Sequence, residues 1–258
     1  QLVTADYAIT LDFDVTESLN TQTSFGGQYY QKKQLSRGSR GLVFPTGVVT
    51  TISGAATTSA DEDFLENVTA GVYVQEQLGW NDRIFLTGAV RWDDNSAFGE
   101  NFDAAVYPKL SATWVMSEES FFNIDMVNQF RLRSAWGKSG RQPDIFAAQR
   151  FYDPNTGPGG SSVLTPGTIG NPDLKPETSA EIEVGADLTL FDDRVSASFT
   201  YYDRTTLDAI LEMDLAASSG FPGSRSVNAG EVKAWGQEVQ IDADVVTTTT
   251  HKTLRGPR

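Results

Sequence analysis

Hydrophobic and polar residues alternate with a period of two over several long stretches of the chain. In residues 182–190 every second residue is Ile, Val, Ala or Leu, and the residues between them are Glu, Gly, Asp and Thr. The polar string FDDR follows at 191–194, and the alternation resumes over 195–202. A period of two marks a strand with two chemically different faces, so these residues predict a β-hairpin.

The same alternation recurs along the rest of the chain, over residues 7–13, 84–93, 106–114, 130–136 and 238–245. Helical spacing appears nowhere over a useful length. We count nine strand segments of roughly 10 to 13 residues, where the usual length is about 5–6. The pattern predicts an all-β, antiparallel fold.

The connections between these segments alternate in length. Short links are expected near residues 15–19, 79–83, 117–126 and 191–194. Long links, rich in Gly, Ser, Thr and Pro, are expected near 34–66, 140–177 and 206–230, with a medium link at 94–103. In an up-and-down sheet, alternate links lie at opposite ends. Short turns at one end and long loops at the other are typical of a transmembrane β-barrel, whereas a β-sandwich has no reason to sort its loops.

Strand length and aromatic positions favour the same architecture. A tilted membrane strand needs about 9–11 residues. We expect aromatic residues at the strand ends, where a barrel carries its interface girdles: Tyr29, Tyr30, Trp80, Trp92, Phe121, Phe122, Tyr201 and Tyr202. Nine strands are an odd number for a bacterial barrel, and open edges would leave backbone groups unpaired in hydrocarbon. The nine strands are therefore expected to be part of a larger, closed barrel.

Composition excludes several functions. The 258 residues contain 20 Lys and Arg against 34 Asp and Glu, a formal net charge of −14, which argues against nucleic acid as a partner. There is no cysteine, and His251 in the tail is the single histidine. Thiolate metal sites and Ser-His-Asp chemistry are thereby excluded. We expect no catalytic residue, no metal and no cofactor, and therefore no enzyme.

Three polar stretches resemble functional sites but lack the features that such sites require. The acidic string Asp93–Asn101 lacks the spacing of a calcium loop and is expected to be a solvated hairpin loop. The carboxylate pairs Asp93/Asp94 and Asp192/Asp193 do not suit glycoside hydrolysis, because the first two are adjacent on a strand and point to opposite faces, and the second two lie in a predicted tight turn. The string GPGGSS at 157–162 lacks the lysine of a phosphate-binding loop and is expected to be flexible.

Several strings together resemble a known family. LGWNDRIFLTGAVRWDDNSAFGENFDAAVYPKLSATWVMSEESFF, RLRSAWGKSGRQP, NPDLKPETSAEIEVGADLTLFDDRVSASFTYYDRTT and NAGEVKAWGQEVQID keep a fixed order and spacing. They are similar to the barrel region of TonB-dependent outer-membrane receptors of the SusC/RagA-like branch. The resemblance covers the chain from Gln1 to about Val245.

The resemblance implies a 22-stranded barrel in the bacterial outer membrane, filled by an N-terminal plug and driven by TonB–ExbB–ExbD. It also implies a SusD-like lipoprotein partner and import of bulky nutrients such as oligosaccharides or peptides. No plug or TonB box is recognised here, and the end VVTTTTHKTLRGPR is unlike a barrel strand. We expect residues 1–245 to be a middle-to-late part of the barrel and 246–258 to be an atypical tail, either disordered or foreign to the family.

Two groups of residues are candidates for a role in this barrel. The motif NPDLKPE follows a long loop, and its prolines restrict the backbone before the strand begins. We interpret it as structural, holding the strand in register: Asn171, Pro172, Asp173, Leu174, Pro176 and Glu177. The second group is expected to face the lumen and to pair with each other, the plug or polar substrate: Arg91, Asp93, Arg131, Arg133, Glu181, Glu183 and Asp187.

Two other functions stay open on the sequence. The chain could be a soluble, secreted β-sandwich that binds glycans through its loops, or a passive porin. Recovery in the outer-membrane fraction separates the importer from the soluble module, and an upstream plug separates it from the porin.

Overall fold

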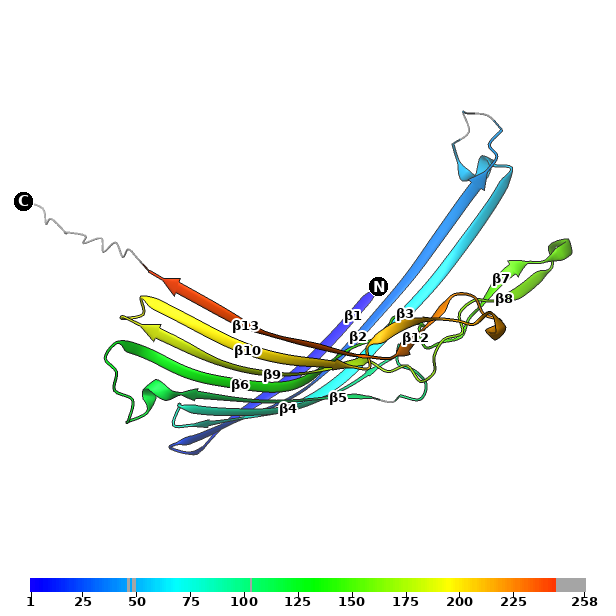
Figure 1. The fold of residues 1–258 in the computed structure, drawn as a ribbon. Helices are drawn as coiled ribbons and strands as arrows, with labels where there is room; N and C mark the ends of the chain where they lie inside the picture. The colour runs from blue at the N-terminus through cyan, green and yellow to red at the C-terminus, as the bar shows by residue number, and fades with distance from the viewer. Residues whose placement is uncertain (46, 48–49, 103, 245–258) are drawn as a thin grey trace, which may run out of the picture.

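The computed structural model describes residues 1–45, 47, 50–102 and 104–244 as one long, curved antiparallel sheet with loops at one end (Figure 1). Its nine strands lie in the order β1-β2-β3-β4-β5-β6-β9-β10-β13. Their bounds are β1 (Leu2–Thr16), β2 (Leu19–Leu42), β3 (Thr57–Trp80), β4 (Ile84–Asn95), β5 (Ala105–Val115), β6 (Val127–Arg141), β9 (Glu177–Leu190), β10 (Val195–Leu207) and β13 (Glu231–Ala243). Each strand pairs with its neighbours in sequence once the short loop strands are set aside, and β1 and β13 form the two edges. The predicted all-β, up-and-down arrangement is confirmed, and the sheet is open.

Two long connections carry small hairpins of their own. β7 (Tyr152–Thr156) pairs with β8 (Ser162–Pro166), and β11 (Ile210–Asp214) pairs with β12 (Ser224–Asn228). Four 3₁₀ turns lie at Ile52–Gly54, Met116–Glu118, Pro158–Gly160 and Ala217–Ser219. These four short strands were not predicted from the sequence, since five residues are too few for alternation to stand out from loop composition. The GPGGSS string forms the tip of the β7–β8 hairpin.

The connections are sorted by length as predicted. Residues 17–18, 81–83, 116–126 and 191–194 form the links at one end, and residues 43–56, 96–104, 142–176 and 208–230 form those at the other. Figure 1 shows the β7–β8 hairpin and β12 gathered at this second end. At the first end, Asn81 and Asp82 adopt φ of 50° and 54°, a left-handed conformation that Asn and Asp tolerate in tight turns.

One predicted boundary was wrong. The long link expected over residues 34–66 is a loop only over 43–56, because β2 and β3 each run for 24 residues. Their outer halves pair with each other from Gln34↔Leu65 to Leu42↔Thr57, and Arg37 Nε lies 2.6 Å from Glu62 Oε2. This two-stranded extension reaches beyond both neighbouring strands (Figure 1). Polar residues occupy both of its faces, so the period of two was hidden.

The register places residues of like character side by side across the sheet. One row joins Leu78, Leu86, Ala112, Ser134 and Val184 on the apolar face. Leu86 is 49 % exposed and Leu110, on the same face, 58 %. The described residues therefore bury no core against this face, as a soluble sandwich would. None of the described helices is long and apolar enough to cross a membrane.

The aromatic prediction holds at one end only. Trp80 ends β3, and Phe121 and Phe122 lie in the link after β5, where Phe121 packs against Trp114 with ring centroids 6.3 Å apart. Trp92 lies three residues before the end of β4. The prediction was wrong for four tyrosines, which lie inside strands: Tyr29, Tyr30, Tyr201 and Tyr202. The sequence places these adjacent tyrosines at strand ends because the alternating apolar stretches stop there, whereas β2 and β10 continue beyond them.

Candidate functional site: a charged sheet face below linked loops

The seven charged residues singled out in the sequence lie on one face of the sheet, opposite the apolar row. The pairings Arg131↔Asp187, Ala135↔Glu183 and Gly137↔Glu181 place the β6 and β9 members side by side. Arg91 and Asp93 follow on β4, on the same face. Whether this polar face lines a lumen stays a prediction.

The polar face carries an ion-pair cluster near the short-turn end. Arg131 donates from Nε and Nη2 to Asp187 Oδ2, at 3.0 and 2.9 Å. Arg133 Nε lies 3.4 Å from the same carboxylate, and Ser198 Oγ donates to it at 3.0 Å. Arg133 also reaches Thr200 Oγ1 at 2.5 Å. Two guanidinium groups thus share one carboxylate, and the cluster keeps one positive charge in excess.

Two more pairs stand on this face. Arg204 donates to Glu181 Oε2 at 2.7 Å from Nε, and Arg91 Nε lies 2.7 Å from both oxygens of Asp93. Arg91 also donates to Gln28 Oε1 at 3.0 Å. Glu183, the remaining member, makes neither a hydrogen bond nor an ion pair with any described side chain. Six of the seven predicted residues are therefore held in ion pairs.

The NPDLKPE motif lies at the loop end, where it folds into a turn before β9. Asp173 N donates to Asn171 Oδ1 at 3.2 Å, and Leu174 N to the Asn171 carbonyl at 3.1 Å. The Leu174 side chain is 0 % exposed, the largest fully buried side chain among the described residues. The turn therefore has a small hydrophobic core of its own.

On one side, the motif binds the loop between β4 and β5. Gly99 N donates to the Leu174 carbonyl at 2.8 Å, and Asn101 N to the Pro172 carbonyl at 3.2 Å. Asn101 Nδ2 donates to Asp173 Oδ1 at 2.6 Å. A Cβ at Gly99 would overlap the Pro172 backbone, so this approach requires glycine.

On the other side, the motif binds the loop between β10 and β13. Asn228 Nδ2 donates to the Lys175 carbonyl at 2.8 Å, and Asn228 Oδ1 accepts from Lys175 N at 2.9 Å. Asn171 Nδ2 donates to the Ser226 carbonyl at 3.0 Å, and Glu177 Oε1 accepts from Ile210 N at 2.9 Å. The motif and its two partner loops, here called the loop hub, thus join three of the four long connections.

The expectation of a solvated loop at Asp93–Asn101 was wrong. Asp93 to Asn95 complete β4, and Asn95, Ala97 and Phe98 are buried. The loop is covered because it folds against the motif, a contact between residues 72 positions apart that local composition does not reveal. Asn95 Nδ2 donates to Thr69 Oγ1 at 2.6 Å and to Gln142 Oε1 at 2.9 Å.

Three residues of the loop hub were not predicted from the sequence, namely Gly99, Asn101 and Asn228. They stand in strings that carried the resemblance, FGEN and NAGE, but only the folded chain shows that they meet the motif. The turn expected at Asp192 and Asp193 is confirmed, with φ of 55° and 63°. Over the described residues, no three His, Cys, Asp or Glu side chains lie where they could hold a metal ion. His251 lies outside the described residues.

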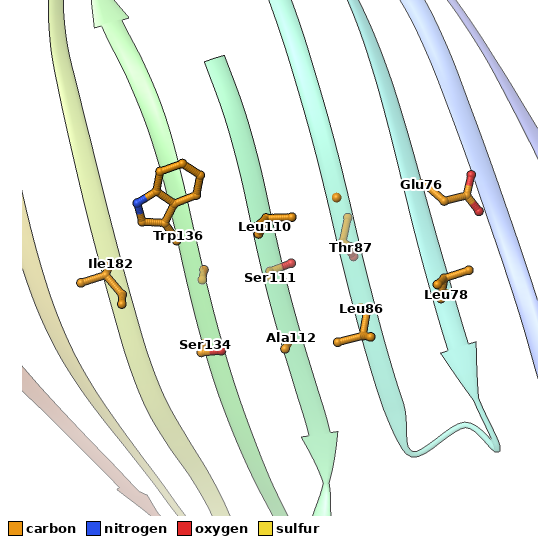
Figure 2. A pocket seen from close by; sticks show the side chains of 12 residues that line it. Glu76, Leu78, Leu86, Thr87, Leu110, Ser111, Ala112, Ser134, Trp136 and Ile182 are labelled. Carbon is orange, nitrogen blue, oxygen red and sulfur yellow. The ribbon is translucent and has the colours of Figure 1, made fainter. Parts of the chain in front are cut away.

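The apolar face carries a furrow of about 420 Å³ (Figure 2). It lies where small residues interrupt the large ones, at Gly88, Ala112 and Ser134. Leu86, Leu110 and Trp136 stand around it in the figure. At its edge Glu76 accepts hydrogen bonds from Thr21 and, at 2.6 Å, from Thr23.

Comparison with known proteins identifies the class that this architecture defines. The family model for TonB dependent receptor-like, beta-barrel matches residues 2–254. The chain belongs to this family, as the sequence analysis predicted, and is part of the barrel of an outer-membrane receptor.

Two curated relatives come from Formosa agariphila. TonB-dependent receptor P26 is 27 % identical over 236 residues, which cover 88 % of this chain and 24 % of the relative. TonB-dependent receptor P3 is 28 % identical over 234 residues, covering 86 % and 23 %. The chain thus spans about a quarter of the length of these relatives.

Solved structures show the same fold. The RagAB peptide transporter superposes with a TM-score of 0.86 at 21 % identity, covering 95 % of this chain and 28 % of that one. The siderophore receptor PirA from Acinetobacter baumannii superposes with a TM-score of 0.57 at 18 % identity, covering 95 % and 34 %. The higher score with RagAB agrees with the SusC/RagA-like resemblance.

Proposed function

We propose that this chain forms nine strands in the barrel wall of a TonB-dependent importer of bulky nutrients such as oligosaccharides or peptides. The observation that carries the proposal is the two-faced sheet. Its apolar side chains are exposed, its other face carries paired charges, and all its long loops lie at one end. Only a bilayer covers an apolar face of this kind over the whole length of its strands, because lipid-facing and lumen-facing residues alternate in barrels.

The open edges β1 and β13 require further strands. Unpaired N–H and C=O groups in hydrocarbon cost several kcal/mol each by common estimates, so a membrane sheet closes. We propose that this chain works as part of a complete receptor. Its plug would contact TonB–ExbB–ExbD, and a SusD-like lipoprotein would act at the loop end.

The candidate residues take defined places in this proposal. Arg91, Asp93, Arg131, Arg133, Glu181, Glu183 and Asp187 line the lumen, and the apolar face contacts outer-membrane lipid. The loop hub, built around Asn171, Pro172, Asp173, Leu174, Pro176 and Glu177, holds the loops above that lumen and fixes where β9 begins. The ion pairs and hub hydrogen bonds described above support these roles.

The absence of cysteine from this chain makes the face assignment testable. In the complete receptor in its native outer membrane, with any cysteine outside this chain replaced by serine, Glu183→Cys and Val184→Cys place single thiols on opposite faces of β9. We expect a membrane-impermeant maleimide to label position 183 and a lipid-soluble maleimide to label position 184. Equal labelling of both positions by the impermeant reagent would support the soluble module and refute the barrel.

A second measurement tests transport. Deleting tonB, or the receptor's own TonB box, should abolish growth on the imported nutrient while the receptor stays in the outer-membrane fraction. Uptake that continues without TonB would favour the passive porin.

A further inference from the structure

A hollow of about 370 Å³ lies on the polar face near the loop end. Its lining includes Lys109 on β5, Ala135, Gly137 and Ser139 on β6, and Glu181 and Glu183 on β9, with Trp136 and Lys138 completing it. Lys109, Gly137 and Glu181 each lie four residues from the loop end of their strand. The hollow thus lies between the loop hub and the Arg131–Asp187 cluster, because Arg133 of that cluster is two residues from Ala135 on the same face.

Gly137 creates the hollow. The pairings Lys109↔Gly137 and Gly137↔Glu181 set a cation and a carboxylate on either side of a residue without a side chain. Two strand spacings separate the Cα atoms of Lys109 and Glu181, roughly 10 Å. A Cβ at position 137 would lie 3.8 Å from Lys109 Cβ and 3.7 Å from the Pro108 carbonyl, which is ordinary contact. The glycine is therefore not imposed by backbone crowding.

The charged side chains that line the hollow differ in whether they have an ion-pair partner. Glu181 is held by Arg204 Nη2 at 2.6 Å. Lys109 and Glu183, by contrast, form no ion pair or side-chain hydrogen bond with any residue that the structure describes. The Lys109 ammonium and the Glu183 carboxylate are therefore available to a ligand. Gly137, which has no side chain, lies between the strands that carry them and lets the main chain of a ligand approach closely.

We propose that this hollow binds a short peptide with free ends, its carboxylate at Lys109 and its amine at Glu183. Glu183 lies two residues beyond Glu181 on β9, so its Cα is roughly 12 Å from that of Lys109. At 3.3–3.6 Å per residue, about three to four residues span this distance. The volume of about 370 Å³ suits a ligand of that size. A neutral sugar would leave both charges unpaired. The inference rests on the proposed function, because only a lumen-facing hollow below the loops meets an incoming nutrient.

The test measures binding of trialanine, N-acetyl-trialanine and trialanine amide to the purified complete receptor by isothermal titration calorimetry. The unmodified receptor should prefer trialanine over both blocked peptides. Lys109→Gln should weaken trialanine about tenfold and remove the preference over the amide, because hydrogen bonds to charged groups are among the strong ones. Glu183→Gln should instead remove the preference over the acetylated peptide.

Two further variants control the result. Lys233→Gln, which removes a lysine at the loop end of β13, should leave all three affinities unchanged. Gly137→Val fills the floor and should weaken the three peptides together. If the Gly137→Val receptor does not assemble in the membrane, the peptide affinities of Lys109→Gln and Glu183→Gln alone test the proposal.

The outcomes separate this inference from the proposed function. Equal binding of the three peptides, or no binding, in a receptor that still supports TonB-dependent growth overturns the peptide site alone. Loss of thermal stability in Lys109→Gln with unchanged peptide affinity also overturns it, because the hollow then holds a segment of the receptor itself. Absence of TonB-dependent growth refutes the proposed function.

Discussion

Leu174 should be the side chain on which the loop hub depends. It is fully buried in a turn that otherwise makes hydrogen bonds within itself and to two neighbouring loops. Leu174→Ala removes three carbon atoms from this core, and core truncations of this kind cost about 2–5 kcal/mol. Loops can collapse into the space, so we expect the lower part of that range, about 2–3 kcal/mol.

This loss of stability should appear as local unfolding of the loop hub, because Leu174 lies in a loop and not in the nine-stranded sheet. A loss of about 2–3 kcal/mol corresponds to a roughly 30- to 150-fold larger open population. Hydrogen–deuterium exchange of the complete receptor measures this directly, at the amides of Gly99, Asn101 and Leu174, each of which donates within the hub. Exchange in the strands should stay unchanged.

Leu164→Ala is the matched control, since Leu164 on β8 is 69 % exposed and undergoes the same chemical change. It should leave hub exchange unaltered. Unchanged exchange at Gly99 in Leu174→Ala would show that the three loops are held independently of the motif, and the reasoning would fail.

Three further predictions concern charges. Asp187→Asn should lower the unfolding temperature of the barrel, read from heat-modified migration on gels, more than Arg131→Gln does, since it leaves two guanidiniums without their carboxylate. Hydrogen bonds from Ser226 and Ser224 lower the pKa of Glu212 on β11 below its ordinary value of 4.5. The hairpin β11–β12 should therefore keep this stabilisation above that pH and lose it as the pH falls through the lowered pKa. Exchange at several pH values tests this, and Glu212→Gln should show no step. Finally, Glu76→Gln should raise the barrel's unfolding temperature in lipid, because it keeps bonding partners for Thr21 and Thr23 while removing a charge from the apolar face. An unchanged or lower temperature would contradict a lipid-facing position.

The sequence predicts the strands that carry one apolar face, and the reason is physical. In residues 182–190 the period of two is imposed by the surroundings of the two faces, so it can be read without knowing the fold. The outer halves of β2 and β3 have polar residues on both faces, and no period distinguishes them from a loop. Pairs such as Arg37 and Glu62 become informative only when the register is known.

The charged face was predicted and the loop hub was not, for a related reason. Arg131 and Asp187 alternate with apolar residues on their own strands, which places them on the same face before any pairing is known. Gly99 and Asn228 lie in irregular loops, and their partners in the motif are 53 to 75 positions away. Such contacts follow from the pairing of strands that are distant in sequence, which local composition does not give.

The loop hub and the hollow are connected through β9. Glu177 begins this strand and accepts a bond from the β10–β13 loop, and Glu181 and Glu183 follow four and six residues later on the same face. An extended strand has a nearly fixed rise per residue. The hydrogen bond that Glu177 accepts from Ile210 N therefore also sets the position of Glu183 relative to Lys109 on β5. The β4–β5 loop, which leads into β5, is fastened to the same motif through Gly99. Both sides of the hollow are thus anchored at one point above it. A nutrient that displaced the loops would disturb the spacing of the two charges, and a peptide bridging them would favour the ordered arrangement of the loops.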